Sequence, residues 1–211
     1  QPVRAAFGNA PGIWRAGNLA RLLPLLIPIV VSRLGLASEL FLLLFAGRFV
    51  PLWAVPLLWG ALHLVKTGAS LGSALAARRV GSRAVVAAGW PMHALVFGGF
   101  ALAAIRWNAV FAGSAHDGMA GEATRSLPVP EGAVVAIVGL FCAWGLYAGL
   151  CEGAEKDLIA ARAEPGKEGG AFGIYHLVVG MAAVPASVGY GFAWDSFGPA
   201  AAFAGGRALA A

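Results

Sequence analysis

Long apolar segments separated by short polar loops constrain this sequence more than any other feature. Five segments and the start of a sixth cover roughly residues 19–46, 52–77, 84–105, 133–159, 170–194 and 200–211. A membrane-spanning helix needs about 20 predominantly apolar residues, and each of the five complete segments meets that length. Only 12% of the residues are charged and 59% are hydrophobic, whereas a soluble domain is typically about 25% charged. The sequence therefore predicts an all-α polytopic membrane protein with five complete transmembrane helices and the start of a sixth.

Most of the basic residues lie in or beside the loops, and these are unequally divided between the two sides. The net charge of +5 comes without a continuous basic patch or interleaved stacking aromatics, which argues against a nucleic-acid partner. One side collects eight cations: Arg4, Arg15, Arg21, Arg78, Arg79, Arg83, Arg162 and Lys167. The other collects three: Arg48, Arg106 and Arg125. Because cytoplasmic loops carry the excess of Lys and Arg, we expect the loops at residues 78–83 and 162–168 to be cytoplasmic.

Two regions outside the apolar segments complete the organisation. Residues 1–18 are polar and predict a cytoplasmic linker, and residues 19–211 form the transmembrane bundle. The chain begins with Gln1 and ends at Ala211 inside an apolar run, so we expect it to be a piece of a longer protein. The long polar segment 106–132 holds His116, Asp117 and Glu122 without a recognised metal-binding spacing. We expect no metal, no cofactor and no enzymatic activity, since hydrolase, kinase and dinucleotide-binding motifs are lacking.

Ionisable side chains interrupt the first two apolar segments. Arg33 and Glu39 lie six residues apart, on roughly opposite sides of a helix, so each needs a partner elsewhere. His63 and Lys66, at positions i and i+3, share one face of the second segment. His63 is either part of a site or a histidine that packs between helices. Because ionisable groups within a membrane are costly and are usually paired, we expect a buried acidic partner for Lys66.

The fourth apolar segment carries glycines at a regular spacing. Gly145, Gly149 and Gly153 recur every four residues, and small residues at this spacing allow another helix to approach closely. Glu152 lies in the same segment and is a candidate functional group. Three further charged residues follow near the cytoplasmic end, where we expect interfacial or gating roles: Glu155, Lys156 and Asp157.

The stretch from Trp144 to Pro199 resembles the penultimate helix pair of the major facilitator superfamily of secondary transporters. The matching residues are Glu152, Gly153, Glu155, Lys156, residues 169–175, Gly180, residues 185–187, Gly191 and residues 194–199. A weaker resemblance extends over nearly the whole chain. It implies that the chain is the carboxy-terminal six-helix half of such a transporter, in a bacterial inner membrane.

The loop after the second segment resembles a loop that the family repeats in each half, Gly-x-x-x-Asp-Arg-x-Gly-Arg-Arg. Arg79, Gly81 and Arg83 match this pattern, while Arg78 stands in place of the aspartate. Glu168 lies where the family often has arginine. One hypothesis is that the gating pair survives with its signs exchanged, as Arg78 with Glu168; the alternative is that both are solvated loop charges.

The resemblance implies a central cavity near the membrane midplane, between two bundles that rock about it. The candidates for substrate binding or proton coupling are Arg33, Glu39, His63, Lys66, Glu152 and Tyr175. A carboxyl group in a low-dielectric pocket tends to hold a proton, so Glu39 or Glu152 could couple proton movement to substrate movement. The alternative is structural: either acid neutralises Lys66 or Arg33 and fixes the helix register.

Two functions therefore remain open. The first is secondary active transport of a small molecule by alternating access, as a symporter or antiporter, with a proton as the candidate coupling ion. The second is a non-transporting, transporter-derived subunit or assembly factor of a larger membrane complex. In the first case the partners are the lipid bilayer, the substrate and a missing amino-terminal half; in the second, a partner membrane subunit covers the cavity face.

Overall fold

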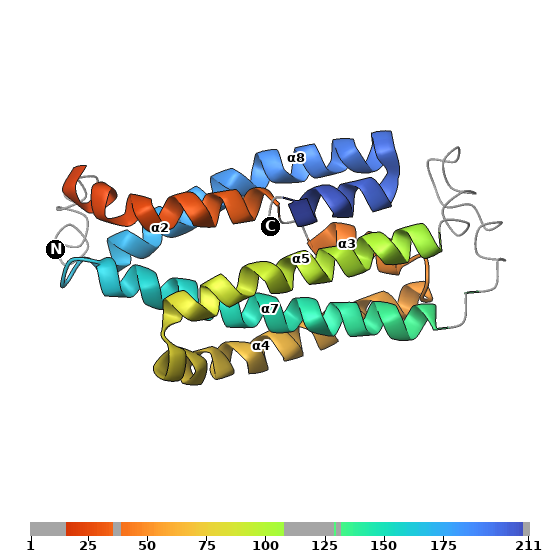
Figure 1. Cartoon of the computed structure of the whole chain (residues 1–211), viewed down its shortest axis with the longest axis horizontal. Helices are drawn as coiled ribbons and strands as arrows, with labels where there is room; N and C mark the ends of the chain where they lie inside the picture. The colour runs from red at the N-terminus through yellow and green to blue at the C-terminus, as the bar shows by residue number, and fades with distance from the viewer. Residues whose placement is uncertain (1–15, 36–38, 108–128, 130–131, 209–211) are drawn as a thin grey trace, which may run out of the picture.

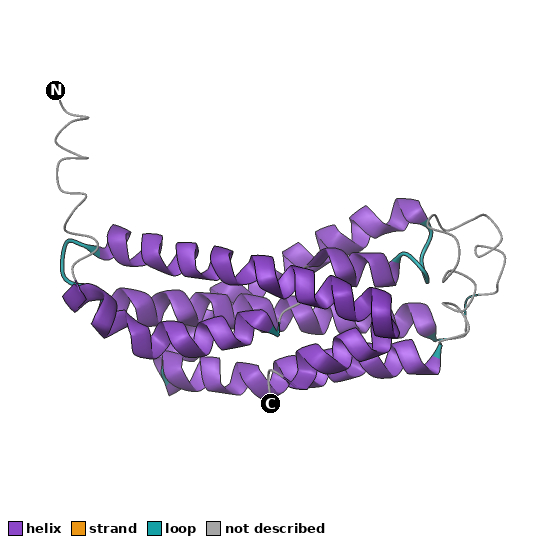
Figure 2. Cartoon of the chain, turned by 90° about the horizontal axis from the view of Figure 1, so that it is seen from above, coloured by secondary structure: helices purple, strands orange, loops and turns teal. Residues whose placement is uncertain are grey.

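The computed structural model describes residues 16–35, 39–107, 129 and 132–208, and these residues form helices and turns without a strand. The helices run along the long axis of an elongated bundle (Figures 1 and 2). In chain order they are α2 (Ala16–Leu34), α3 (Glu39–Ala46), the 3-10 turn η2 (Leu52–Ala54), α4 (Val55–Val80), α5 (Ser82–Arg106), α7 (Ala133–Arg162) and α8 (Glu168–Ala208). The all-helical prediction is confirmed for the described residues, whereas most of the predicted linker lies outside them.

The predicted first segment corresponds to two described helices, and the predicted fifth segment and the start of the sixth correspond to one helix with a reversal. Where one segment was expected over residues 19–46, α2 ends at Leu34 and α3 begins at Glu39. Helix α8 contains a reversal at Gly198, whose φ of 83° and ψ of 171° leave the helical region. Figure 1 shows the residues after this glycine folding back along those before it. The fifth predicted segment and the start of the sixth are thus the two arms of α8.

The turns gather at the two ends of the bundle. One end holds the start of α2, the α4–α5 turn and the α7–α8 loop, and the other holds the α3–α4 connection and the reversal at Gly198 (Figure 1). The α4–α5 turn consists of Gly81 at a φ of 85°, a backbone conformation that favours glycine. Arg78 and Arg162 lie at the first end, and Arg48 and Arg106 lie at the second. This grouping matches the predicted division of the loop cations.

Four helical segments of the described chain are long and apolar enough to cross a membrane: Ala20–Ala46, Ser82–Arg106, Ala133–Arg162 and Glu168–Ala208. With 26 residues, α4 is long enough but is not among them, since His63, Lys66, Arg78 and Arg79 make it less apolar. The count of four also treats the two arms of α8 as one segment. It therefore does not establish the predicted five helices plus a sixth.

The outward-facing side chains agree with a bilayer environment. Large apolar residues are more than 60% exposed along the flanks of several helices, including Leu64 of α4, Leu95 of α5, Val135 of α7 and Val184 of α8. Monomeric soluble proteins rarely leave so much contiguous apolar surface in water. The length, composition and exposed surface of the helices are consistent with an integral membrane protein.

Two apolar clusters hold the helices together. The larger joins α3, α4, α5, α7 and the end of α8, with aromatic contacts at its centre. The Phe203 ring lies 5.1 Å from the rings of Phe45 and Phe100, between centroids. The smaller cluster packs Leu22 and Leu26 of α2 against the first part of α8 and the end of α7. Helix α7 contributes to both clusters and so connects the two sides of the bundle.

Candidate functional site

A connected series of charged side chains, here called the Lys66 network, joins α3, α4 and α7. It consists of His63, Glu39, Lys66, Glu152 and Lys156. The Lys66 Nζ atom lies 3.2 Å from Glu152 Oε2 and 3.8 Å from Glu39 Oε1. At one end, Lys156 Nζ donates a hydrogen bond of 2.8 Å to Glu152 Oε1, and at the other His63 Nε2 lies 3.5 Å from Glu39 Oε2. The predicted acidic partner of Lys66 is therefore present, in the form of two carboxylates.

The Lys66 network remains partly accessible. Its side chains are between 28% and 42% exposed, although Lys66 lies near the middle of α4. Partly exposed charges at that depth cannot face hydrocarbon without a large cost. In a membrane, this face of the bundle requires water, a ligand or another protein surface beside it.

A second group, here called the Arg33 triad, is buried between α2, α7 and α8. Arg33 Nη2 donates to Glu155 Oε2 at 2.5 Å, and the Tyr175 hydroxyl donates to the same oxygen at 2.8 Å. The Glu155 side chain is only 6% exposed. A buried carboxylate with two donors, one of them a guanidinium, is a well-satisfied ion pair. The triad fixes the position of α7 relative to α2 and α8.

The candidate residues thus fall into two groups of ion pairs, whose α7 carboxylates, Glu152 and Glu155, lie three residues apart. Arg33 and Tyr175 belong to the triad, while Glu39, His63, Lys66 and Glu152 belong to the Lys66 network. Arg33 and Glu39 each have a partner on another helix, as expected from their positions on opposite sides of a helix. Of the structural alternatives, the neutralisation of Lys66 by Glu39 and Glu152 occurs, whereas Arg33 pairs with Glu155.

The glycine ladder of α7 positions Lys66. A Cβ atom at Gly149 would lie 2.2 Å from the Lys66 carbonyl oxygen, and one at Gly145 would lie 2.8 Å from the Leu62 carbonyl oxygen. At Gly153 the nearest atom is the Ser73 hydroxyl oxygen, at 2.7 Å. The backbones of α4 and α7 can approach this closely because these positions lack side chains. Lys66 is therefore held beside Glu152 by the backbone contact of its own helix turn.

A hydrogen bond strengthens the same interface. The hydroxyl of Ser73, which is 1% exposed, donates to the Leu150 carbonyl oxygen at 2.8 Å. Beyond the end of α4, the hydroxyl of Ser82, the first residue of α5, donates to the Asp157 carboxylate of α7. Helices α4 and α7 form the most extensive helix–helix contact among the described elements. Four of the five residues of the Lys66 network lie on these two closely packed helices.

The predicted gating residues lie in and beside the loops at one end of the bundle. Arg78 and Arg79 occupy the last turn of α4, Gly81 forms the turn, and Arg83 begins α5. The Glu168 carboxylate accepts a hydrogen bond of 3.1 Å from the Gly166 backbone N–H. No ion pair joins Arg78 to Glu168 in the described chain, and both side chains are exposed. In this conformation they correspond to the alternative of solvated loop charges.

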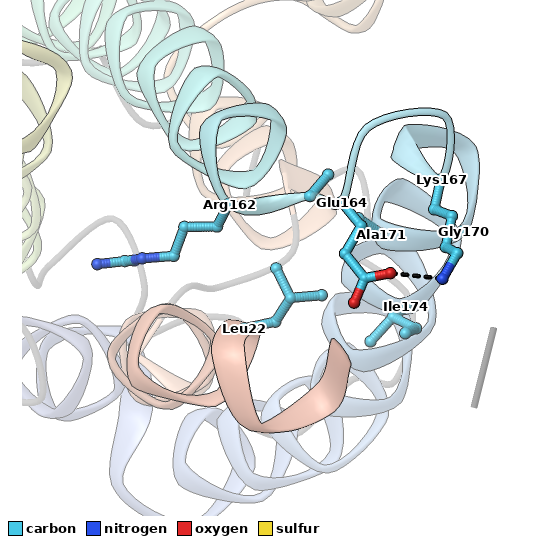
Figure 3. Close-up of a pocket in the computed structure, with 8 residues that line it drawn as sticks. Leu22, Arg162, Glu164, Lys167, Gly170, Ala171 and Ile174 are labelled. Carbon is cyan, nitrogen blue, oxygen red and sulfur yellow. Dashed lines mark hydrogen bonds and ion pairs between the residues drawn. The ribbon is translucent and has the colours of Figure 1, made fainter. Parts of the chain in front are cut away.

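A small cavity lies beside the α7–α8 loop, and no residue of the Lys66 network or the Arg33 triad lines it (Figure 3). Leu22, Glu164, Lys167, Ala171 and Ile174 are among its lining residues, and its volume is about 20 Å³. The carboxylate of Glu164 and the ammonium of Lys167 form an ion pair beside it. Because this volume accommodates about one water molecule, the cavity is too small for a metabolite.

The structure also bears on the expected absence of a metal. Among the described residues, no three His, Cys, Asp or Glu side chains form a group that could hold a metal ion. His116, Asp117 and Glu122 lie outside the described residues. Cys142 and Cys151 are free thiols.

Sequence reasoning missed the role of Glu155, which was expected at the cytoplasmic interface. It lies one helical turn from Cys151 and one from Ile159, and all three are buried. That spacing of four residues was the available signal, because residues at i and i+4 share a helix face. The signal is weak because the helix is apolar on nearly every side, so its inward face does not stand out.

A buried histidine is a second feature that the sequence did not single out. His93 of α5 is fully buried between the rings of Phe97, at 4.5 Å, and Tyr147, at 5.2 Å, and neither ring nitrogen has a hydrogen-bond partner among the described residues. It is enclosed by the core and does not belong to the Lys66 network.

Comparison with known proteins adds no assignment: no family model, no curated protein and no solved structure matches the chain.

Proposed function

We propose that this chain is a helical bundle of a secondary transporter that moves a small molecule across a membrane by alternating access. The observation that carries the proposal is the Lys66 network, in which charged groups from three helices stay partly exposed near the middle of the bundle. Ionisable residues inside membrane segments face a cavity or a bundle interior and mark substrate or ion pathways. Glu39 and Glu152 are the candidate proton-coupling residues.

The resemblance to the major facilitator superfamily supports a more specific form of this proposal. The chain would be the carboxy-terminal half of such a transporter, with the first arm of α8 as the fifth helix and the second arm as the start of the sixth. The Lys66 network would face the cavity between the halves, and α4 with α7 would move as a unit. The end that carries Arg78 and Arg162 would be cytoplasmic in a bacterial inner membrane.

A specific observation favours the second candidate, a non-transporting membrane subunit. Every carboxylate of the Lys66 network and of the Arg33 triad is already paired within the chain. A purely structural role, in which the pairs fix the positions of the helices, is sufficient to explain them. This is the role expected in a scaffold whose open face is covered by a partner subunit.

The first test is the intact mass of the native protein extracted from its membrane. A mass near twice the 21.5 kDa of this chain is expected for a transporter with a second bundle in the same polypeptide. A native mass near 21.5 kDa would instead direct the search to a partner subunit.

The second test is transport itself. Inverted membrane vesicles with and without the protein are incubated with a metabolite mixture, and the solutes retained are identified by mass spectrometry. A transporter enriches at least one solute, and Glu152→Gln and Glu39→Gln each abolish its proton-driven accumulation at equal expression. Glu164→Gln, which breaks an ion pair in the α7–α8 loop, serves as the matched control. Absence of any protein-dependent solute would favour the scaffold, and full accumulation in both network variants would remove the coupling role.

A further inference from the structure

The links of the Lys66 network are unequal, and Glu39 is its most weakly held carboxylate. Glu152 has two ammonium partners, Lys156 at 2.8 Å and Lys66 at 3.2 Å. Glu39 has Lys66 at 3.8 Å and His63 at 3.5 Å, both longer than the roughly 2.7–2.9 Å of a charge-assisted hydrogen bond. Among the described residues, His63 and Lys66 of α4 are the charged or titratable groups within ion-pair distance of Glu39. The α7 residues of the network, Glu152 and Lys156, lie on the other side of Lys66 from Glu39 in the series of contacts. Glu39 is therefore the group that leaves Lys66 most easily.

The helices that carry these groups differ in the same way. Lys66 is fixed, because the backbone of its helix turn lies against Gly149 of α7. Glu39 begins α3, a helix of only eight residues, whose buried residues Leu42, Phe45 and Ala46 all lie further along it. Phe41, two residues further on, packs against the Tyr190 ring at 4.8 Å between centroids and anchors the body of α3. The Glu39 side chain itself is 30% exposed, and its two long ion-pair contacts are with α4 side chains.

We propose that Lys66 is the anion-binding residue of the transport path, and that the substrate is a monovalent organic carboxylate that replaces the Glu39 carboxylate at the Lys66 ammonium. The Glu39 carboxylate, once separated from Lys66, takes up one proton from the aqueous phase and becomes a neutral carboxylic acid. The substrate anion then occupies its place beside Lys66. One proton and one negative charge enter the site together, so the loaded site has the same net charge as the empty one.

The chemistry of the site favours an anion over a cation. A cation would have to displace Lys66, which α7 holds in place, whereas an anion has to displace only Glu39. The group replaced, the Glu39 side chain, is a carboxylate, so a substrate carboxylate would interact with the same Lys66 ammonium in the same way. Moving the Glu39 carboxylate away from the Lys66 ammonium favours its protonated form. Proton uptake by Glu39 is thereby coupled to anion binding at Lys66. This inference rests on the proposed function, since it names the class of substrate that the transporter would carry.

The test uses the protein as its gene encodes it, purified in detergent, with sodium formate as the probe. Formate is the smallest carboxylate, so it fits wherever a carboxylate has been removed. The thermal unfolding midpoint is measured from tryptophan fluorescence in formate and in chloride at equal ionic strength. Formate is expected to raise the unfolding midpoint above its value in chloride in Glu39→Ala and Glu39→Gln. The formate concentration needed should be lower than for the unmodified protein, because the Lys66 ammonium of these variants lacks its Glu39 partner.

Two further variants assign the effect to Lys66. The double variant Glu39→Gln with Lys66→Gln keeps the net charge of the chain, and it is expected to lose the formate effect. Lys167→Gln, which removes an ion-paired lysine from the α7–α8 loop, is the matched control and is expected to respond as the unmodified protein does. If formate stabilises neither Glu39 variant, or if its effect persists without Lys66, the proposal is wrong.

The proton is tested by the pH dependence of formate affinity. The comparison is made in a His63→Gln background, which removes the histidine and leaves Glu39 and Glu152 as the carboxylates within ion-pair distance of Lys66. Affinity is expected to rise by about tenfold for each unit that the pH falls, because one proton binds with each anion. Adding Glu39→Gln is expected to make the affinity independent of pH; an unchanged slope in this variant would refute the role of Glu39.

These results are distinguishable from failure of the transport proposal. Lys66-dependent formate binding with no solute moved in vesicles would leave the anion site standing and refute the transporter. Protein-dependent accumulation of a cation or a neutral solute, without formate binding, would support the transporter and refute the anion site.

Discussion

The glycine ladder of α7 provides the most quantitative prediction. Replacing Gly149 by alanine would place the new methyl group 2.2 Å from the Lys66 carbonyl oxygen and 2.7 Å from the Ala69 Cβ atom. Ordinary van der Waals contact begins at 3.4 Å, so the α4 backbone would have to retreat by about 1.2 Å at this turn. A backbone carbonyl cannot rotate away as a side chain can. The shift would also move Lys66 away from Glu152.

The three ladder positions should be affected in a definite order. Overpacking a close contact costs about 1–3 kcal/mol of unfolding free energy, and Gly149→Ala should lie at the upper end. Gly145→Ala meets the Leu62 carbonyl at 2.8 Å and should cost less. Gly153→Ala meets the Ser73 hydroxyl oxygen at 2.7 Å and the Ser73 Cβ atom at 2.9 Å. The hydroxyl could turn aside only by losing its hydrogen bond to Leu150, so this variant should cost at least as much as Gly145→Ala.

The matched control is Gly139→Ala on the same helix, where a Cβ atom would meet nothing within 4 Å. Alanine is the better helix former by about 1 kcal/mol, so this variant should be as stable as the unmodified protein or more so. Unfolding is followed by tryptophan fluorescence in detergent. If Gly149→Ala unfolds at the same temperature as Gly139→Ala, α4 and α7 do not approach as closely as described.

Three other perturbations test the remaining contacts. Arg33→Gln and Glu155→Gln should each lower the unfolding free energy by about 3–5 kcal/mol, because each leaves a buried charge without its partner, and the double variant should recover most of this loss. Arg21→Gln is the control, since its exposed ion pair is worth about 0–1 kcal/mol. If the single variants lower the unfolding midpoint no more than Arg21→Gln does, the triad is not a buried ion pair. Gly198→Ala should cost about 1–3 kcal/mol, since φ 83° and ψ 171° suit only glycine, and limited proteolysis should show faster cleavage at the turn. Ser73→Ala should lower the unfolding free energy by about 0.6 kcal/mol through loss of its hydrogen bond to α7, and an effect as large as that of Gly149→Ala would contradict this reasoning.

Much of the helix layout could be predicted from the sequence, because membrane-length apolar segments leave few alternatives. The predicted segments 84–105 and 133–159 agree with α5 and α7 to within three residues at each end. The predicted segment 19–46 corresponds to α2 and α3 together, and Ala20–Ala46 is long and apolar enough to form one membrane span. The reversal at Gly198 was approximated by placing a new segment near residue 200, where glycine and proline adjoin.

The candidate site was predictable only in part. A lysine near the middle of an apolar helix demands an acid, so the partnership of Lys66 followed from electrostatics alone. Which acid pairs with which base did not follow, because Arg33 and Glu155 are separated by 122 residues and no local rule connects them. The sequence predicts that Arg33 and Lys66 face one cavity; in the fold they pair with two different carboxylates of α7, Glu155 and Glu152, which lie three residues apart.

The close fit of α4 against α7 has a consequence for biosynthesis. If the chain spans a membrane as proposed, α4 entering it alone would bear the cost of Lys66, about 2.5–3.5 kcal/mol at the centre of a helix, and α4 has no acidic residue of its own to offset that cost. Glu39 is synthesised before α4, but Glu152, the glycine ladder and the carbonyl that accepts the Ser73 hydrogen bond come later, the last of these by 77 residues. In a nascent chain that extends only to the end of α5, α4 would therefore lack its stabilising contacts with α7. Stable insertion of α4 would then require the synthesis of α7. Insertion errors should accordingly be most frequent in α4. A substitution in the glycine ladder would lower the efficiency of α4 insertion during synthesis, before the protein has folded.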